Sequence, residues 1–325
     1  MAGTNNQQAT DGATNTSPIE RLKVVVVAGP TAVGKTALSI TLAQQFGGEI
    51  INADSRYLYQ GFDIGVDKPT LAERQGIPHH LIDVLPPSGE MTLARYQDLA
   101  NTTIREVAAR RRVPILTGGT PLYINAVIEG WRIPRVPPDP EFRARSEANA
   151  AQDGGGSLMQ RLREVDPVSA DRCGTNIRRV IRALEVYEAT GVPMSAQEGK
   201  GPPPYDALEI GLSRPRDELF RIIDKRVNAQ IERGLVQEVA SLLAAGVPPN
   251  SPAMSSIGYR QLLPYLDGTL SLDDALEHIR FDTHRYVRHQ ETWLRKNPRL
   301  VRIDVSAGSW QNHAVAAVAA FLRSD

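Results

Sequence analysis

Largely apolar runs of strand length recur in the first part of the chain, at residues 23–28, 49–53 and 113–117. Each run has the length and composition of a strand buried inside a sheet. Longer segments at 35–46 and 92–112 lie between the runs and predict helices, the second with basic residues in its last turn. Strands that alternate with helices in this way predict a parallel, doubly wound α/β sheet.

The pattern becomes mainly helical after residue 134, where Pro-Pro-Asp-Pro at 137–140 predicts a stiff linker. Beyond the linker the sequence predicts helices at 141–152, 158–164 and 176–190, a strand at 207–212, a helical stretch at 217–245 broken near Gly234, a helix at 272–297 and a strand at 300–305. We therefore expect an α/β core formed by residues 19–136 and 205–325, with a helical insertion at 137–204. Residues 1–18, rich in Asn, Gln, Thr and Ala, predict a disordered tail.

Composition narrows the classes of protein to which the chain can belong. The 37 basic and 37 acidic residues balance, so no overall positive charge indicates a nucleic-acid partner, although a local basic face would suffice. The single cysteine, Cys173, excludes an intrachain disulfide and a cysteine-rich zinc finger, which fits a reducing cytoplasm. No apolar run has the length of a membrane span, and residues 1–18 contain no signal-peptide core. We expect a cytoplasmic monomer without a membrane partner.

The sequence GPTAVGKT at residues 29–36 directly follows the first predicted strand and leads into the first predicted helix. This is the setting of a P-loop, whose backbone N–H groups surround a phosphate while the helix dipole and Lys35 supply positive charge. The Thr36 hydroxyl would contact a phosphate-bound Mg²⁺. The preceding strand disfavours the alternative of an ordinary glycine-rich turn. We expect a P-loop NTPase-like fold and a phosphate site formed by Gly29, Pro30, Thr31, Ala32, Val33, Gly34, Lys35 and Thr36. The motif leaves open whether the ligand is hydrolysed, donates phosphate or releases diphosphate.

Two further polar turns follow predicted strands, where ligands of parallel sheets bind. Asp54 ends the second strand, beside Ser55 and Arg56, and its carboxylate could bind Mg²⁺, act as a general base or cap a helix. Thr120 follows two glycines after the third strand and could cap a helix or hydrogen-bond a flat ligand to which the glycines give access. The adjacent histidines at 79–80 lack the spacing of a helical metal site.

Basic residues are concentrated in two segments of the chain. Arg178, Arg179 and Arg182 recur at helical spacing, and residues 280–302 hold seven basic side chains against two acidic ones, with aromatic residues interleaved. Basic and aromatic side chains together suit a phosphate backbone and unstacked bases, whereas a single such run is commonly a solvated helix face. Segregation of positive charge in a chain of zero net charge favours RNA contact.

Seven motifs occur in a fixed order: GPTAVGKT at 29–36, INADSRYLYQGFDIGVDKPT at 51–70, IPHHLIDV at 77–84, GGTPLYI at 118–124, RRVIRALEVYEATG at 178–191, SSIGYRQLLPYLDG at 255–268 and RHQETWLRK at 288–296. This ordered set resembles the tRNA dimethylallyltransferases, also called tRNA isopentenyltransferases, and the resemblance covers residues 23–304. Tyr57 departs from the glutamine usual in the family, and Pro121 from a common glycine.

The resemblance implies transfer of a dimethylallyl group from dimethylallyl diphosphate to N6 of the adenosine beside the anticodon of tRNA, with Mg²⁺ as cofactor. It implies that Lys35 and Thr36 stabilise the departing diphosphate, that Asp54 is the general base and that Thr120 contacts the target adenosine. Arg216 would be a further diphosphate ligand. The implied tRNA contacts are Asp54, Ser55, Arg56, Tyr57, Thr120, Arg143, Arg178, Arg179, Val180, Ile181, Arg182, Ser256, Ile257, Gly258, Tyr259, Arg260, Gln261, Arg288, His289, Gln290, Thr292, Trp293 and Arg295.

Three other functions share part of this pattern. An adenylate isopentenyltransferase uses the same donor on a free nucleotide, but would not require the helical insertion or the basic C-terminal segment. A small-molecule P-loop kinase would need an arginine-rich lid and a better Walker B strand than residues 81–84. An RNA-binding protein with a regulatory nucleotide site predicts no role for Asp54. The ordered motifs favour the tRNA-modifying enzyme.

Overall fold

The computed structural model describes residues 21–324, so the tail expected at 1–18 lies outside the described residues. Six strands form one sheet in the order β3-β2-β4-β1-β7-β8, and every neighbouring pair is parallel. The strands are β1 Lys23–Ala28, β2 Gly48–Asn52, β3 His79–His80, β4 Val113–Gly118, β7 Asp206–Ser213 and β8 Val301–Asp304. The predicted parallel α/β fold is confirmed.

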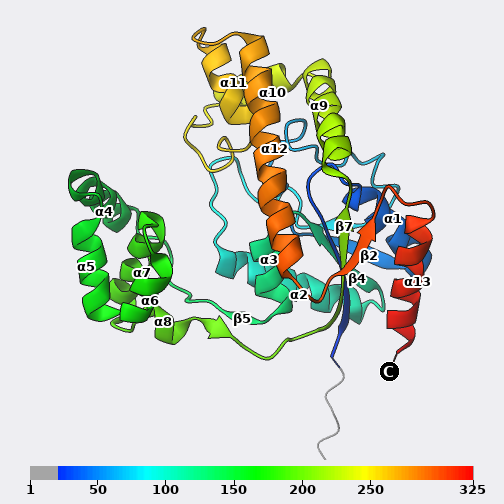
Figure 1. The fold of residues 1–325 in the computed structure, drawn as a ribbon, viewed down its shortest axis with the longest axis horizontal. Coiled ribbons are helices and arrows are strands. Elements are labelled where there is room, and N and C mark those ends of the chain that lie inside the picture. The colour runs from blue at the N-terminus through cyan, green and yellow to red at the C-terminus, as the bar shows by residue number, and fades with distance from the viewer. Residues whose placement is uncertain (1–20, 325) are drawn as a thin grey trace, which may run out of the picture.

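The central strand β1 explains why this sheet is covered on both faces. The side chains of residues 24–27 are four valines with no exposed surface, and Val25 pairs with Ile115 on one side and Leu208 on the other. β-Branched residues that are apolar without alternation suit a strand buried between two helical layers. One face is covered by α1 Lys35–Phe46 and α13 Trp310–Arg323, the other by α2 Leu93–Ala109 and α3 Pro121–Ile128 (Figure 1).

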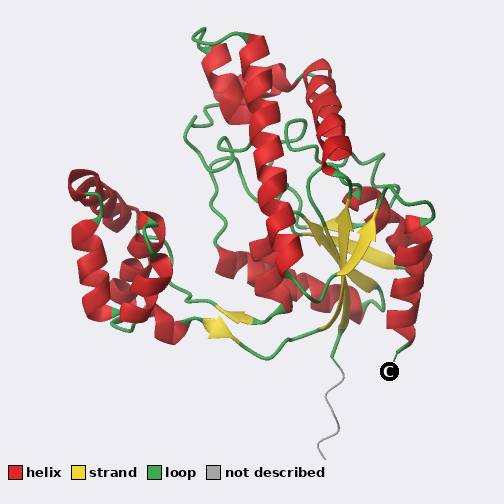
Figure 2. Cartoon of the chain, viewed as in Figure 1, coloured by secondary structure: helices red, strands yellow, loops and turns green. Residues whose placement is uncertain are grey.

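A group of helices extends beyond the edge of the sheet where the strands end (Figure 1). It consists of α9 Arg216–Glu232, α10 Leu235–Ala244, α11 Tyr259–Leu266 and the 25-residue α12 Leu272–Lys296. Both α9 and α11 pack against α12. The far end of α12 reaches the sheet, so this helix joins the extension to the ends of the central strands (Figure 2).

Residues 140–197 form a separate helical unit with its own apolar core. Its helices are α4 Pro140–Asp153, α5 Gly156–Val165, α6 Pro167–Cys173, α7 Ile177–Thr190 and α8 Met194–Gln197. Leu158, Leu162, Val180 and Leu184 are buried in that core. A two-stranded antiparallel ribbon, β5 Trp131–Arg132 and β6 Gly199–Lys200, joins the unit to the α/β core, and the unit stands to one side of it (Figure 1).

The structure departs from the predicted elements mainly at short helices and helix ends. Helix α2 ends at Ala109, so the basic residues expected in its last turn lie beyond it. Helices α3, α6, α8, α11 and α13 and the two-residue strands β3, β5 and β6 were not predicted. The break predicted near Gly234 is present, because Gly234 adopts a φ of +97° between α9 and α10. No helix within residues 21–324 combines the length and apolar character that a membrane crossing requires.

Candidate functional site

The P-loop connects β1 to α1 and contains a half-buried cation, Lys35. The Lys35 ammonium group donates a hydrogen bond to the carbonyl of Pro30 at 2.8 Å. Burial lowers the pKa of Lys35 to about 8; the Asp54 carboxylate opposes this shift and Arg226 adds to it. A lysine held against the loop's own backbone in this way is ready to meet an anion.

Asp54 lies two residues beyond the end of β2, and its two carboxylate oxygens have different surroundings. Oδ1 accepts the N–H of Arg56 at 2.9 Å, which forms a local turn instead of a helix cap. Oδ2 lies 3.5 Å from where a Cβ on Gly119 would be, at the end of the neighbouring β4. One oxygen therefore fixes the carboxylate while the other remains available to a ligand in the cavity that Asp54 lines.

Thr120 does not cap the helix that it precedes. Its hydroxyl oxygen accepts the N–H of Ser55 at 3.0 Å, which ties the end of β4 to the end of β2. The two glycines before it, which the sequence suggested would give a flat ligand access, also make close contacts within the protein. A Cβ on Gly118 would lie 2.2 Å from the Ala53 backbone, and one on Gly119 would lie 2.6 Å from Gln290. Close packing therefore requires both glycines, and access by a flat ligand stays a prediction.

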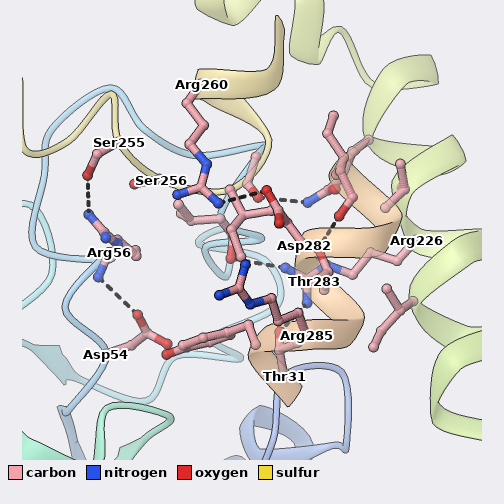
Figure 3. Close-up of a pocket in the computed structure, with 18 of the residues that line it drawn as sticks. Thr31, Asp54, Arg56, Arg226, Ser255, Ser256, Arg260, Asp282, Thr283 and Arg285 are labelled. Carbon is pink, nitrogen blue, oxygen red and sulfur yellow. Dashed lines mark hydrogen bonds and ion pairs between the residues drawn. The ribbon is translucent and has the colours of Figure 1, made fainter. Parts of the chain in front are cut away.

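A cavity of about 530 Å³ opens beside these strand ends. Figure 3 shows Asp54 and Arg56 on one side of it and Arg226 on the opposite side. Thr31 brings the P-loop to its wall, and α12 contributes a stripe at helical spacing that includes Asp282, Tyr286 and His289. The predicted contact residues that line the cavity are Asp54, Ser55, Arg56, Thr120, Ser256, Ile257, Arg260 and His289.

Arg226 is a site residue that the sequence analysis missed. Its guanidinium donates to the Thr31 hydroxyl at 3.1 Å and pairs with Asp67 at 3.3 Å. It lies on the face of α9 that also carries Ile223, Val227 and Gln230, all of which line the cavity. A charged residue within the buried stripe of an amphipathic helix is the signal that could have identified it.

Arg216 borders a second cavity of about 340 Å³, which Pro30 of the P-loop also lines. The Arg216 guanidinium pairs with Glu291 at 2.6 Å. Arg214, Arg295 and Arg302 complete a basic lining around apolar side chains of β7 and α12. The P-loop thus contributes to two cavities, one lined by Asp54 and the other by Arg216.

Several predicted tRNA contacts have side chains that are unavailable to RNA. Val180 and Ile181 are buried in the core of the helical unit, and Tyr259 is buried with its hydroxyl against Glu238. Gln261 caps the backbone of Gly258 and donates to Asp282. Gln290 is buried between loops, whereas Trp293 is half-buried beside a small cavity that Gly29 also lines, so RNA contact by Trp293 stays a prediction. We correct the role of the buried side chains to contacts within the protein, which are apolar packing for Val180 and Ile181 and hydrogen bonds for Gln261 and Gln290.

Arg143 and Arg182 of the helical unit share the buried carboxylate of Glu185, to which the Arg143 guanidinium donates at 2.8 Å. Arg143 therefore holds α4 against α7, whereas Arg182 pairs with Glu185 within α7 and also donates to the carbonyl of Val136. Arg178 and Arg179 on α7 are exposed, as are Arg288 and Arg295 on α12. Thr292 donates its hydroxyl to the carbonyl of Arg288.

The Tyr57 side chain lines a small cavity with Thr36 and donates its hydroxyl to the carbonyl of Asp67 at 2.8 Å. The Tyr57 hydroxyl is therefore engaged within the protein, and contact of this residue with tRNA stays a prediction. Pro121 occupies the first position of α3, where a missing N–H costs nothing. His80 pairs with Glu49, and no group of three or more His, Cys, Asp or Glu side chains within residues 21–324 could hold a metal ion.

A P-loop, a strand-end carboxylate and a basic cavity on one edge of a parallel sheet define an enzyme that acts on a phosphorylated ligand. The sequence model of the IPP transferase family matches residues 57–297. A tRNA dimethylallyltransferase from Thermomicrobium roseum is 52% identical, over 94% of this chain and 93% of its own, and one from Roseiflexus sp. is 48% identical, over 91% and 98%.

Solved structures similar to this one belong to the same family as these relatives. A tRNA isopentenylpyrophosphate transferase from Bacillus halodurans has a TM-score of 0.70 at 36% identity, covering 92% of this chain and 96% of the other. A eukaryotic dimethylallyltransferase acting on tRNA has a TM-score of 0.77 at 29% identity, covering 93% and 79%. The chain belongs to the tRNA dimethylallyltransferase family.

Proposed function

We propose that this protein transfers a dimethylallyl group from dimethylallyl diphosphate to N6 of the adenosine that follows the anticodon of tRNA. The observation that carries the proposal is the convergence of Thr31, Asp54 and Thr120 on one cavity. The P-loop would hold the diphosphate, and Asp54 would meet the acceptor base. Family membership supports this pairing of donor and acceptor over a kinase or a free-nucleotide acceptor.

The donor's diphosphate would bind the backbone N–H groups of residues 29–36, with positive charge from Lys35. Arg226 adds a guanidinium from the cavity side, and Arg216 another from the second cavity. These cations would stabilise the negative charge that grows on the diphosphate as the bond to its allylic carbon breaks. Because the donors are fixed by contacts to Pro30, Thr31 and Glu291, little reorganisation is needed.

The acceptor's N6 is a poor nucleophile, because its lone pair is delocalised into the adenine ring. In the proposed step N6 bonds to the allylic carbon while that carbon's bond to the diphosphate oxygen breaks, and the electron pair leaves with the diphosphate. The proton on N6 moves to Oδ2 of Asp54. Thr120, held by Ser55, would orient the base beside that oxygen.

The residues present fit a Mg²⁺ ion bound mainly by phosphate and water. Thr36 lines a small cavity with Asn52 and Thr117, so neutral oxygen donors surround the first turn of α1. Mg²⁺ in phosphate sites commonly takes few protein ligands, which agrees with Thr36 as its main ligand here. When bound, the ion would supply positive charge to the leaving diphosphate.

The acceptor cavity has the size of a small-molecule site, large enough for one nucleoside turned out of the anticodon loop. Arg260, Arg285, Tyr286 and His289 on its walls offer stacking surfaces and hydrogen-bond donors. Arg178 and Arg179 of the helical unit would contact the phosphates of the stem. Monomeric state and cytoplasmic location stay predictions.

The test is incubation of the purified protein with Mg²⁺ and labelled dimethylallyl diphosphate, with unmodified tRNA and AMP offered separately. Label should appear on tRNA and be lost when the adenosine next to the anticodon is replaced. Label on AMP alone would assign the chain to nucleotide modification. ATP turnover with no label on either acceptor would show that the donor is wrong.

A further inference from the structure

The buried amide of Gln290 joins the P-loop to the loop that follows β4. Gln290 is 4% exposed. Its Oε1 accepts the N–H of Thr31 at 3.0 Å, and its Nε2 donates to the carbonyl of Gly119 at 2.8 Å. A single side chain of α12 therefore spans the two loops that the proposed reaction must hold at a fixed separation.

Contact between Gln290 and Gly119 is tight. A Cβ on Gly119 would lie 2.6 Å from Nε2 of Gln290 and 3.5 Å from Oδ2 of Asp54. Gly119 therefore separates the amide from the proposed general base by little more than its own backbone. Any shift of Gln290 changes the position of this backbone, and with it the surroundings of the Asp54 carboxylate.

The helix that carries Gln290 also lines the acceptor cavity. Tyr286, one turn earlier, lines the cavity and donates its hydroxyl to the same Gly119 carbonyl at 3.3 Å. Thr31 is held a second time by Arg226 of α9, which lines the cavity too. The backbone N–H and the hydroxyl of this P-loop residue are thus both fixed by the helices that face the acceptor.

We propose that Gln290 is a positioning residue that links occupancy of the acceptor cavity to the conformation of the P-loop. A ligand that restrains α12 restrains Gln290, and through it Thr31 and Gly119. Acceptor binding should then strengthen diphosphate binding, and by thermodynamic linkage the diphosphate should strengthen acceptor binding equally. This inference rests on the proposed function.

The chemistry of the two contacts requires an amide, because one end accepts while the other donates. Gln290→Met keeps the length of the side chain and loses both hydrogen bonds. Gln290→Glu keeps the acceptor for Thr31 and loses the donor to Gly119. Gln97→Met is the matched control: Gln97 is also 4% exposed and donates to the carbonyls of Ala126 and Trp131, which do not line the cavity.

The experiment measures binding of inorganic pyrophosphate with Mg²⁺, alone and with a saturating anticodon stem-loop RNA. The RNA should raise pyrophosphate affinity about 5-fold or more in the unaltered protein and in Gln97→Met. Both Gln290 variants should reduce this factor toward one. In Gln290→Met, kcat should also fall on the order of 100-fold, because donor and acceptor lose alignment, with a smaller change in KM for tRNA.

The results of this experiment distinguish a failure of this inference from a failure of the proposed function. If the unaltered protein binds RNA and pyrophosphate and modifies tRNA, but shows no coupling, the inference alone fails. It also fails if a Gln290 variant keeps the coupling, or if Gln97→Met loses it equally. Should Gln290→Met fold poorly by thermal denaturation, Gln290→Glu decides the result. An unaltered protein that binds neither ligand overturns both.

Discussion

Lys35 shows how burial of one residue can make ligand binding depend on pH. Its pKa is lowered to about 8 by burial, against the attraction of Asp54. A bound diphosphate favours the protonated amine, so binding takes up a proton wherever free Lys35 is neutral. Pyrophosphate affinity should therefore be insensitive to Lys35 titration below about pH 8 and fall up to tenfold per pH unit above it. Calorimetric titration from about pH 6.5 to 9.5 measures this decline.

Lys35→Met provides the control for that pH profile. Pyrophosphate itself ionises over the same range, and this affects the protein with and without the lysine in the same way. The difference between the two profiles isolates the contribution of Lys35. Profiles that run parallel above pH 8 would mean that the lysine keeps its charge in the empty site.

Asp54→Asn tests the carboxylate without removing the turn that positions it. The amide oxygen can still accept the N–H of Arg56, while the second position can no longer take a proton from N6. The single-turnover rate should fall about 10²–10⁴-fold with tRNA affinity preserved. Asp282→Asn, which alters another carboxylate of the same cavity, should reduce that rate far less. Normal turnover by Asp54→Asn would exclude this residue as the base.

At the scale of elements, the sequence predicted the helices and strands whose hydrophobic pattern is visible in their own residues. The valines of β1 and the long amphipathic run of α12 are visible without knowledge of their neighbours. Helix α11 was missed because it has eight residues, follows Gly258 and contains Pro264. Asp54 and Thr120 were found because they follow strands. The roles of Gln290 and Arg226 depend on contacts with Thr31, which is 259 and 195 residues away in sequence.

Glu185 fixes helix α7 against α4 in the helical unit. Burial opposes its ionisation, but hydrogen bonds from Arg143, the Asp139 N–H and Arg182 outweigh burial and lower its pKa. A lowered pKa stabilises the fold above the ordinary value of 4.5, and this contribution is lost as pH falls below it. Glu185→Gln should lower the unfolding free energy by on the order of 2 kcal/mol at pH 7 and by less at pH 4.

Denaturant titrations at both pH values measure this difference. Glu188→Gln, on the same helix, removes an ion pair with Arg161 in which both side chains are more than two-fifths exposed. This control should change the unfolding free energy by less than about 1 kcal/mol. Equal effects of the two substitutions, or no pH dependence for Glu185→Gln, would contradict the role assigned to Glu185.

At the scale of the whole molecule, exposed arginines lie on both the helical unit and the α/β core, which the β5–β6 ribbon joins. Exposed Arg178 and Arg179 lie on the helical unit, whereas the proposed chemistry takes place in the α/β core (Figure 1). Contacts from the unit would position tRNA without taking part in the chemical step. Binding and turnover should therefore respond separately to substitutions there, although the protein's net charge is zero.

The Arg178→Ala/Arg179→Ala variant tests this separation. Loss of two phosphate contacts should weaken tRNA binding and reduce the slope of log affinity against log salt by nearly two, because fewer counterions are released. At saturating tRNA the turnover rate should stay unchanged, since Lys35, Asp54 and Thr120 are untouched. Arg163→Ala, another exposed arginine of the unit, is the control and should leave the slope unaltered. An unchanged slope in the double variant would place α7 outside the RNA interface, and a reduced turnover rate would mean that the unit also acts on the chemical step.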